Sequence, residues 1–100
     1  MAAGADDGPG SGALERRVTI VNQRGLHARA AAKFVREAER FAATIEVSNG
    51  DTTVTGTSIM GLMMLAGGIG TEIRLVARGT EAEPAIEALV RLVADGFDEE

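Results

Sequence analysis

The chain contains a single histidine, His27, and basic side chains surround it in the sequence. An unprotonated imidazole is a competent nucleophile near neutral pH. Between residues 16 and 40, seven basic side chains stand against two acidic ones, a local net charge of +5. The basic residues are Arg16, Arg17, Arg24, Arg29, Lys33, Arg36 and Arg40. This combination predicts a site where a nucleophilic histidine meets an anion or an acidic partner surface.

The segment around His27 joins a predicted strand to a predicted helix. Residues 18–21 are β-branched throughout and predict the strand. The helix is predicted from apolar side chains at a 3.6-residue period, namely Ala31, Phe34, Val35, Ala38, Phe41 and Ala42. His27 then lies at or next to the helix N-cap, where backbone N–H groups lack acceptors and the helix dipole is positive. A phosphoryl group on the imidazole would meet N–H donors at Ala28 and Ala30 and a cation at Arg29.

A second interpretation of these residues stays open at this point. A lone histidine at a strand-to-helix junction is most often a surface or capping residue without chemistry. A cluster of arginines is likewise usually a solvated face. The residue types alone therefore indicate an anion site without proving one.

The middle of the chain shows further local patterns. Alternating polar and apolar residues on both sides of the turn-forming segment 49–51 predict a hairpin over residues 44–55. A short apolar helix is predicted over residues 59–66, and the two glycines that follow it end it. Alternation over residues 71–78 predicts a fourth strand with one buried face.

The final helix has the clearest predicted boundary. Thr80 and Glu83 have the spacing of a capping box. The apolar stripe that follows is Ala82, Ile86, Leu89, Val90, Val93 and Phe97. The resulting order, β-α-β-β-α-β-α, predicts an α+β two-layer sandwich whose largely antiparallel sheet is covered by helices on one face.

The composition restricts the class of protein. With 100 residues, 45% of them hydrophobic and 25% charged, the chain fits one globular domain. It contains no cysteine and one histidine, so we expect no disulfide, no metal and no cofactor. The longest apolar run, residues 59–70, is shorter than the roughly 20 residues of a membrane span, and the N-terminus lacks a signal-peptide pattern. We expect a cytoplasmic protein without membrane insertion.

The two ends of the chain differ from its body. Residues 1–13 are small, polar and glycine-rich and predict a disordered tail. Residues 14–97 form the predicted domain, and residues 98–100 form an acidic C-terminal end. The net charge is −5, but six of the acidic residues lie near the ends, so the body is almost neutral. These six are Asp6, Asp7, Asp95, Asp98, Glu99 and Glu100.

Two segments resemble a known family. Residues 25–31, GLHARAA, resemble the GLHARPA active-site signature of HPr, the histidine-containing phosphocarrier of the bacterial phosphotransferase system. Residues 57–65, TSIMGLMML, resemble its regulatory-serine segment and second helix, and the similarity covers about residues 14–97. Ala30 stands where the signature has proline, which gives up a fixed φ but restores a backbone N–H. This variant and the Met-rich helix resemble the regulatory, nitrogen-related branch.

The resemblance implies a fold and a reaction. The fold is an open-faced sandwich with a four-stranded antiparallel sheet and three helices on one face. His27 would attack a phosphohistidine of enzyme I through Nδ1 and then donate the phosphoryl group to a histidine of an enzyme IIA-type acceptor. Arg29 would bind the phosphoryl oxygens or a partner carboxylate. The chain would be a phosphoryl-transfer intermediate rather than a stand-alone enzyme, since such a transfer needs mainly positioning and charge stabilisation.

Ser58 has two compatible roles. It immediately precedes the short apolar helix, where an N-cap hydroxyl contributes about 1 kcal/mol. The resemblance adds phosphorylation by HPr kinase/phosphorylase. A phosphate would bring a charge of about −1.5 to −2 and weaken the docking of an acidic partner.

The short helix is apolar nearly all round, and methionines at such positions are most often core filler. A helix on one face of one sheet cannot bury every side, however, so some of these side chains must be exposed. The resemblance implies a partner-docking patch of Ile59, Met60 and Met63 next to His27, flanked by arginines such as Arg24. A small carrier that meets several partners is expected to be a monomer.

A different class of function remains an alternative, namely a small regulatory α+β domain that binds an anionic metabolite or RNA. Against RNA stand the absence of tyrosine and tryptophan and the low pI of about 4.8. Phe34 and Phe41 lie on the predicted core stripe. A stand-alone hydrolase is disfavoured because the motif gives His27 no serine or cysteine partner. Transfer of phosphate from a donor enzyme to His27 separates these classes.

Overall fold

The computed structural model describes residues 13–65 and 67–99. Within these residues, strands and helices follow one another in the predicted order. They are β2 (Leu14–Thr19), α1 (Ala28–Ala38), β3 (Thr44–Asn49), β4 (Thr52–Thr55), α2 (Ile59–Met64), β5 (Glu72–Arg78), α3 (Ala82–Ala94) and the 3-10 turn η2 (Gly96–Asp98). The predicted disordered tail lies outside the described residues except for Ala13.

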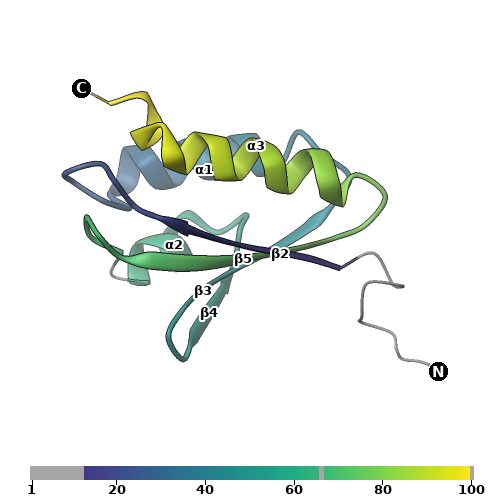
Figure 1. The fold of residues 1–100 in the computed structure, drawn as a ribbon, viewed down its shortest axis with the longest axis horizontal. Helices are drawn as coiled ribbons and strands as arrows, with labels where there is room; N and C mark the ends of the chain where they lie inside the picture. Colours follow the sequence, from purple (N-terminus) through teal and green to yellow (C-terminus); the bar gives the residue numbers. More distant parts are fainter. Residues whose placement is uncertain (1–12, 66, 100) are drawn as a thin grey trace.

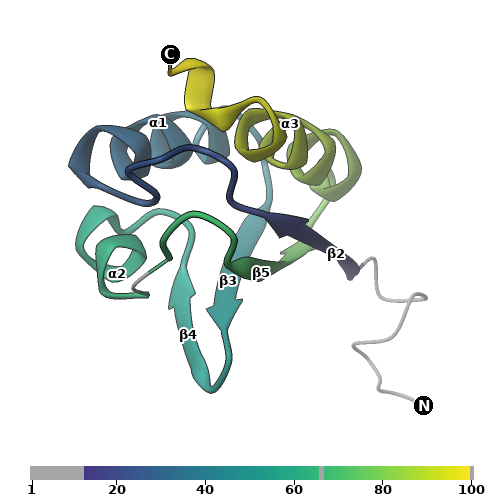
Figure 2. The same cartoon turned by 60° about the vertical axis from the view of Figure 1, so that its left-hand side comes forward.

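The strands form one sheet in the order β2-β5-β3-β4, and each neighbouring pair is antiparallel. Helices α1 and α3 lie side by side over one face of this sheet, and α2 lies beside α1 near β4 (Figure 1, Figure 2). The predicted α+β sandwich, with a four-stranded antiparallel sheet and three helices, is confirmed.

The core fills the space between the sheet and the helices. Alternate strand residues face the helices, and the apolar stripes of α1 and α3 meet them. The largest fully buried side chains include Phe34, Ile45, Ile73, Leu75, Ile86 and Leu89. The opposite face of the sheet is charged, and there Arg74 pairs with Glu15 at 3.4 Å and Arg17 pairs with Glu72 at 3.7 Å. The sandwich is therefore open on that face.

The first strand differs from the prediction in both bounds. It begins at Leu14 rather than at residue 18 and ends at Thr19, while Val21 is exposed. The charged residues at its start pair in register with β5, where Glu15 lies opposite Val76. The ion pairs Arg17–Glu72 and Arg74–Glu15 also join these two strands. Cross-strand partners, which the local sequence does not show, make this charged segment a strand.

Helix α1 is shorter than its apolar stripe suggested. It ends at Ala38, so Phe41 and Ala42 do not continue it. Phe41 still packs against the core as a half-buried side chain, whereas Ala42 is exposed. The predicted helix over residues 59–66 likewise ends early, at Met64, and Ala66 lies outside the described residues.

The predicted capping box at Thr80 and Glu83 is wrong. The N-cap of α3 is Glu81, and its side chain makes no capping hydrogen bond. Its carboxylate instead accepts a hydrogen bond from the N–H of Ala42 at 2.7 Å, and its own N–H donates to the carbonyl of Ala42 at 3.1 Å. A long-range contact between two loops thus replaces the local cap.

Helix α3 ends at Ala94 and does not run through Phe97 as predicted. Gly96 follows with φ +67°, in the left-handed region that stops a helix. Phe97 is nonetheless fully buried, so its assignment to the core is confirmed while its helical conformation is not.

Candidate functional site

His27 is the N-cap residue of α1, as predicted. Its backbone is extended, with φ −73° and ψ 177°, and its side chain makes no capping hydrogen bond. The N–H of Ala31 donates to the carbonyl of His27 at 2.8 Å. This is the first hydrogen bond of the helix. The three N–H groups before it, those of Ala28, Arg29 and Ala30, have no acceptor within the helix. The imidazole therefore lies beside backbone donors that suit an anion.

A tight turn holds the loop that leads to His27. Gly25 has φ +63°, and its N–H donates to the carbonyl of Asn22 at 3.1 Å. The side-chain amide of Asn22 donates in return to the carbonyl of Gly25 at 2.9 Å. A Cβ atom on Gly25 would lie 2.2 Å from the carbonyl oxygen of Gly67, so the close approach of these two loops requires glycine.

A contact that the sequence analysis missed joins His27 to the C-terminal end. The carboxylate of Glu99 is hydrogen-bonded to Nε2 of His27 and also accepts a hydrogen bond from Nδ2 of Asn22 at 3.1 Å. Within residues 13–65 and 67–99, Nδ1 of His27 has no hydrogen-bond partner. The side chain of His27 is 15% exposed and that of Glu99 is 19% exposed. No local pattern could indicate this contact, because the two residues are 72 positions apart.

The surroundings of Glu99 lower its pKa below the ordinary value. The hydrogen bond from His27 is the largest cause, whereas desolvation of the carboxylate acts in the opposite direction. The hydrogen bond from Asn22 and the charges of His27 and Arg24 lower the pKa further. The site is therefore arranged to keep this carboxylate ionised next to the imidazole.

Arg24 and Arg29 flank the histidine on the surface. Both are exposed, and neither makes a hydrogen bond or ion pair within the part of the chain that the structure describes. Arg24 lines a depression that also includes Val21, Ile69 and Glu99. These two guanidinium groups are therefore available to a phosphoryl group or to a partner carboxylate.

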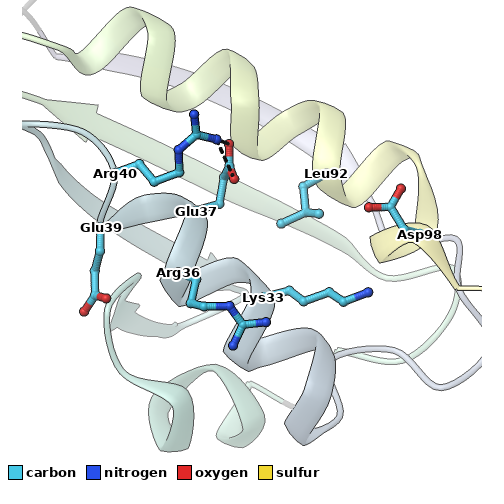
Figure 3. A pocket seen from close by; sticks show the side chains of 7 residues that line it. All are labelled: Lys33, Arg36, Glu37, Glu39, Arg40, Leu92 and Asp98. Carbon is cyan, nitrogen blue, oxygen red and sulfur yellow. Dashed lines mark hydrogen bonds and ion pairs between the residues drawn. The ribbon is translucent and has the colours of Figure 1, made fainter.

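The other basic residues of the 16–40 segment do not extend this positive surface. Arg16 pairs with Glu87 of α3 at 3.4 Å, and Arg17 lies on the open face of the sheet. Lys33, Arg36 and Arg40 line a depression between α1 and the end of α3 that includes acidic side chains as well (Figure 3). Its other lining residues are Glu37, Glu39, Leu92 and Asp98. The local charge of +5 in the sequence is thus dispersed in space.

Ser58 is the N-cap of α2, which confirms its predicted structural role. Its hydroxyl oxygen accepts a hydrogen bond from the N–H of Gly61 at 2.9 Å. Of the helix that follows, Leu62 is fully buried while most of the surface is apolar and exposed. The exposed large side chains of this region are Ile59, Met60, Met63, Met64 and, beyond the helix, Ile69. The predicted exposure of Ile59, Met60 and Met63 is confirmed, and Met64, at 73%, is more exposed than any of them.

Other kinds of site find little support in the described residues. No group of three or more His, Cys, Asp or Glu side chains in them could hold a metal ion. None of their helices is long and apolar enough to cross a membrane. Phe34 and Phe97 are fully buried, and Phe41 packs under the guanidinium of Arg40, so the phenylalanines offer no free stacking platform for RNA bases.

The fold is a small open-faced sandwich, and it presents a histidine at a helix N-terminus. Two exposed arginines and an exposed apolar helix accompany this histidine. These features are typical of a small protein that carries a chemical group on a surface side chain. The family described as "PTS HPr component phosphorylation site" matches residues 14–95. The chain belongs to this HPr family, the phosphocarrier proteins of the phosphotransferase system, and the family implies enzyme I and enzyme IIA as its partners.

Individual relatives agree with this assignment. Phosphocarrier protein HPr of Pseudomonas putida is 49% identical over 85 residues, which cover 84% of this chain and 94% of the relative. Phosphocarrier protein NPr of Shewanella violacea is 44% identical over 86 residues, covering 86% and 94%. The crystal structure of HPr-C-His from Thermoanaerobacter tengcongensis superposes with a TM-score of 0.83 at 42% identity, covering 87% of this chain and 98% of that one.

Proposed function

We propose that His27 is the residue of this phosphocarrier that accepts the phosphoryl group. It receives the group from a phosphohistidine of enzyme I and donates it to a histidine of an enzyme IIA-type protein. The observation that carries the proposal is the position of His27 at the N-cap of α1 with a side chain that takes no part in capping. The backbone donors of that helix end are thereby left for the phosphoryl oxygens.

Each transfer exchanges one N–P bond for another. The lone pair on Nδ1 of His27 attacks phosphorus, the N–P bond to the donor imidazole breaks, and the donor ring keeps the electron pair. The second transfer repeats this exchange with His27 as the donor. The N–H groups of Ala28 and Ala30 and the guanidinium of Arg29 bind the phosphoryl oxygens, so the carrier contributes positioning and charge stabilisation.

The partners dock on the surface next to His27. Ile59, Met60 and Met63 form the apolar part of the docking surface, and Arg24 pairs with acidic residues of the partner. Exposed methionines adapt to differently shaped partners, which suits a carrier that must meet both a donor and an acceptor. The chain works in the cytoplasm. It works as a monomer at this surface, because a second copy bound here would compete with both transfers.

Ser58 is a regulatory site in hosts that contain HPr kinase/phosphorylase. Its hydroxyl accepts the N–H of Gly61, and the exposed side chains of Ile59 and Met60 follow it directly. A phosphate here adds about −1.5 to −2 charges at the edge of the docking surface. Acidic partners would then bind more weakly, while α2 keeps an oxygen acceptor at its N-cap.

The test uses enzyme I from the same organism, phosphoenolpyruvate and each IIA-type protein of that organism. Mass spectrometry and ³¹P NMR should show one acid-labile phosphate on the wild-type chain and on Ser58→Ala, and none on His27→Ala. When each IIA-type protein is added in turn, the acceptor should remove the phosphate from His27. The identity of that acceptor tells a transport role from a regulatory one. A wild-type chain that stays unmodified would overturn the proposal.

A further inference from the structure

The chain after α3 makes an unusual reversal. Gly96, Phe97 and Asp98 all have positive φ, at +67°, +58° and +62°. Residues other than glycine rarely adopt this conformation, and two in succession need surrounding structure to hold them. Phe97 supplies it by complete burial, and the ammonium group of Lys33 donates to the carbonyl of Phe97 at 2.7 Å.

After this C-terminal turn, residues 96–98, the side chain of Glu99 lies against the loop that leads to His27. Glu99 contacts Nε2 of His27 with one carboxylate oxygen and Nδ2 of Asn22 with the other. Asn22 is itself fixed by its hydrogen bond to Gly25, in the turn that positions His27. The imidazole is thus held from two directions, by the helix through its backbone and by the carboxylate through its ring.

The atom that Glu99 contacts decides what the ring can do. A neutral imidazole carries its proton on one nitrogen and its lone pair on the other. A carboxylate only accepts, so Nε2 must carry the proton when it is hydrogen-bonded to Glu99. The lone pair then resides on Nδ1, which has no hydrogen-bond partner among the described residues.

We propose that Glu99 is a positioning residue that fixes the proton on Nε2 of His27 and thereby directs phosphorylation to Nδ1. The inference rests on the proposed function of His27. When Nδ1 forms the N–P bond, the proton remains on Nε2 and the ring acquires a positive charge, which lies next to the carboxylate of Glu99. Removal of Glu99 frees Nε2 to compete as the nucleophile.

A small phosphoryl donor tests this choice of atom without enzyme I. Phosphoramidate is attacked at phosphorus by an imidazole nitrogen, its P–N bond breaks, and ammonia leaves with a proton from solvent. The variants are Glu99→Ala and Glu99→Gln. Asp98→Asn is the matched control, because it removes one negative charge from the same turn and asparagine tolerates positive φ. Spectra of ¹⁵N-labelled protein distinguish phosphate on Nδ1 from phosphate on Nε2.

The wild-type chain and Asp98→Asn should carry phosphate on Nδ1. In Glu99→Ala the ratio of Nε2 to Nδ1 product should rise roughly tenfold, as expected for the loss of one charge-assisted hydrogen bond. Glu99→Gln should fall between the two, because its amide oxygen still accepts while its charge is gone. An unchanged ratio in Glu99→Ala, with the fold intact by NMR, would overturn the role of Glu99.

The same samples separate this inference from the proposed function. If enzyme I and phosphoenolpyruvate fail to phosphorylate the wild-type chain, the carrier role of His27 fails whatever isomer phosphoramidate produces. If enzyme I phosphorylates wild type while phosphoramidate gives the same isomer ratio with and without Glu99, the carrier role stands and the positioning role fails.

Discussion

The N–H of Leu26 donates a hydrogen bond to the carbonyl of Gly67 at 2.9 Å, and this bond ties the residue before His27 to the loop after α2. Leu26 is buried, and a Cβ on Gly67 would lie 3.0 Å from its side chain. The histidine and the exposed apolar helix are therefore parts of one surface, although they lie far apart in the sequence. We therefore expect a partner that covers α2 to reach His27 as well.

Replacement of Gly25 should disturb this junction. Gly25→Ala places a Cβ at positive φ and 2.2 Å from the carbonyl oxygen of Gly67, so we expect a loss of at least ~2 kcal/mol of unfolding free energy. Gly50→Ala is the control, because Gly50 has a similar φ of +62° but nothing within 4 Å of the added Cβ. That variant should lose only about 1 kcal/mol. Denaturant unfolding measures both, and equal losses would contradict the tight approach of the two loops.

The carboxyl group of Glu99 should titrate below its ordinary range. The hydrogen bond from His27 lowers its pKa most, so His27→Ala should shift that pKa upward toward the ordinary value. A carboxyl group whose pKa is depressed by folding adds stability above its unfolded pKa and loses that contribution as the pH falls through its folded pKa. The stability difference between wild type and Glu99→Gln should shrink over the same acidic range. NMR titration of the Glu99 carboxyl group in wild type and in His27→Ala measures the shift. The same pKa of Glu99 in these two proteins would contradict the expected effect of the hydrogen bond.

Ser58 combines a structural role with the proposed regulatory one, and two substitutions separate them. Ser58→Ala removes the acceptor for the N–H of Gly61, so it should cost about 1 kcal/mol of stability and leave phosphorylation by enzyme I almost unchanged. Ser58→Asp keeps a capping oxygen but adds a charge, so it should raise the KM for the carrier in the enzyme I reaction. Denaturation and steady-state kinetics measure the two effects. Equal KM values for Ser58→Asp and wild type would argue against electrostatic regulation at this position.

The apolar surface of α2 should matter for partner affinity more than for folding. Met60 is 70% exposed, so Met60→Gln should change stability by less than about 0.5 kcal/mol. Its KM with enzyme I should rise roughly tenfold, the size of effect that a central contact residue gives. Met64→Gln is the matched control on the same helix and should change KM by less than about threefold if docking centres on Met60 and Met63. Unchanged kinetics in Met60→Gln would remove this helix face from the docking surface.

Much of the fold could be predicted because it depends on local patterns. The apolar period of α1 predicts a helix that begins just after His27, as observed. The turn-forming residues 49–51 likewise predict the hairpin of β3 and β4. The exposure of the Met-rich helix followed from simple geometry, since one sheet cannot cover all sides of a helix. Each of these features involves residues that are close in the sequence.

The features that escaped prediction depend on distant partners. Glu81 bonds to Ala42 across the molecule instead of closing the predicted cap of α3. Positive φ at Phe97 has no signal in the residue type, because a bulky side chain rarely adopts it and here the ring is fully buried. The contact between Glu99 and His27 depends on that turn. The candidate histidine and its place at a helix N-terminus could therefore be predicted from the sequence, whereas its contact with Glu99 could not.

The most direct test of the central claim follows the imidazole itself. The ¹⁵N-labelled chain, with its single histidine, is incubated with enzyme I and phosphoenolpyruvate and observed by ¹⁵N and ³¹P NMR. The account predicts one phosphate, bonded to Nδ1 of His27 and lost again when an IIA-type protein is added. Phosphate on any other residue, or an imidazole that remains unmodified while enzyme I is charged, would contradict the assignment of His27 as the carrier residue.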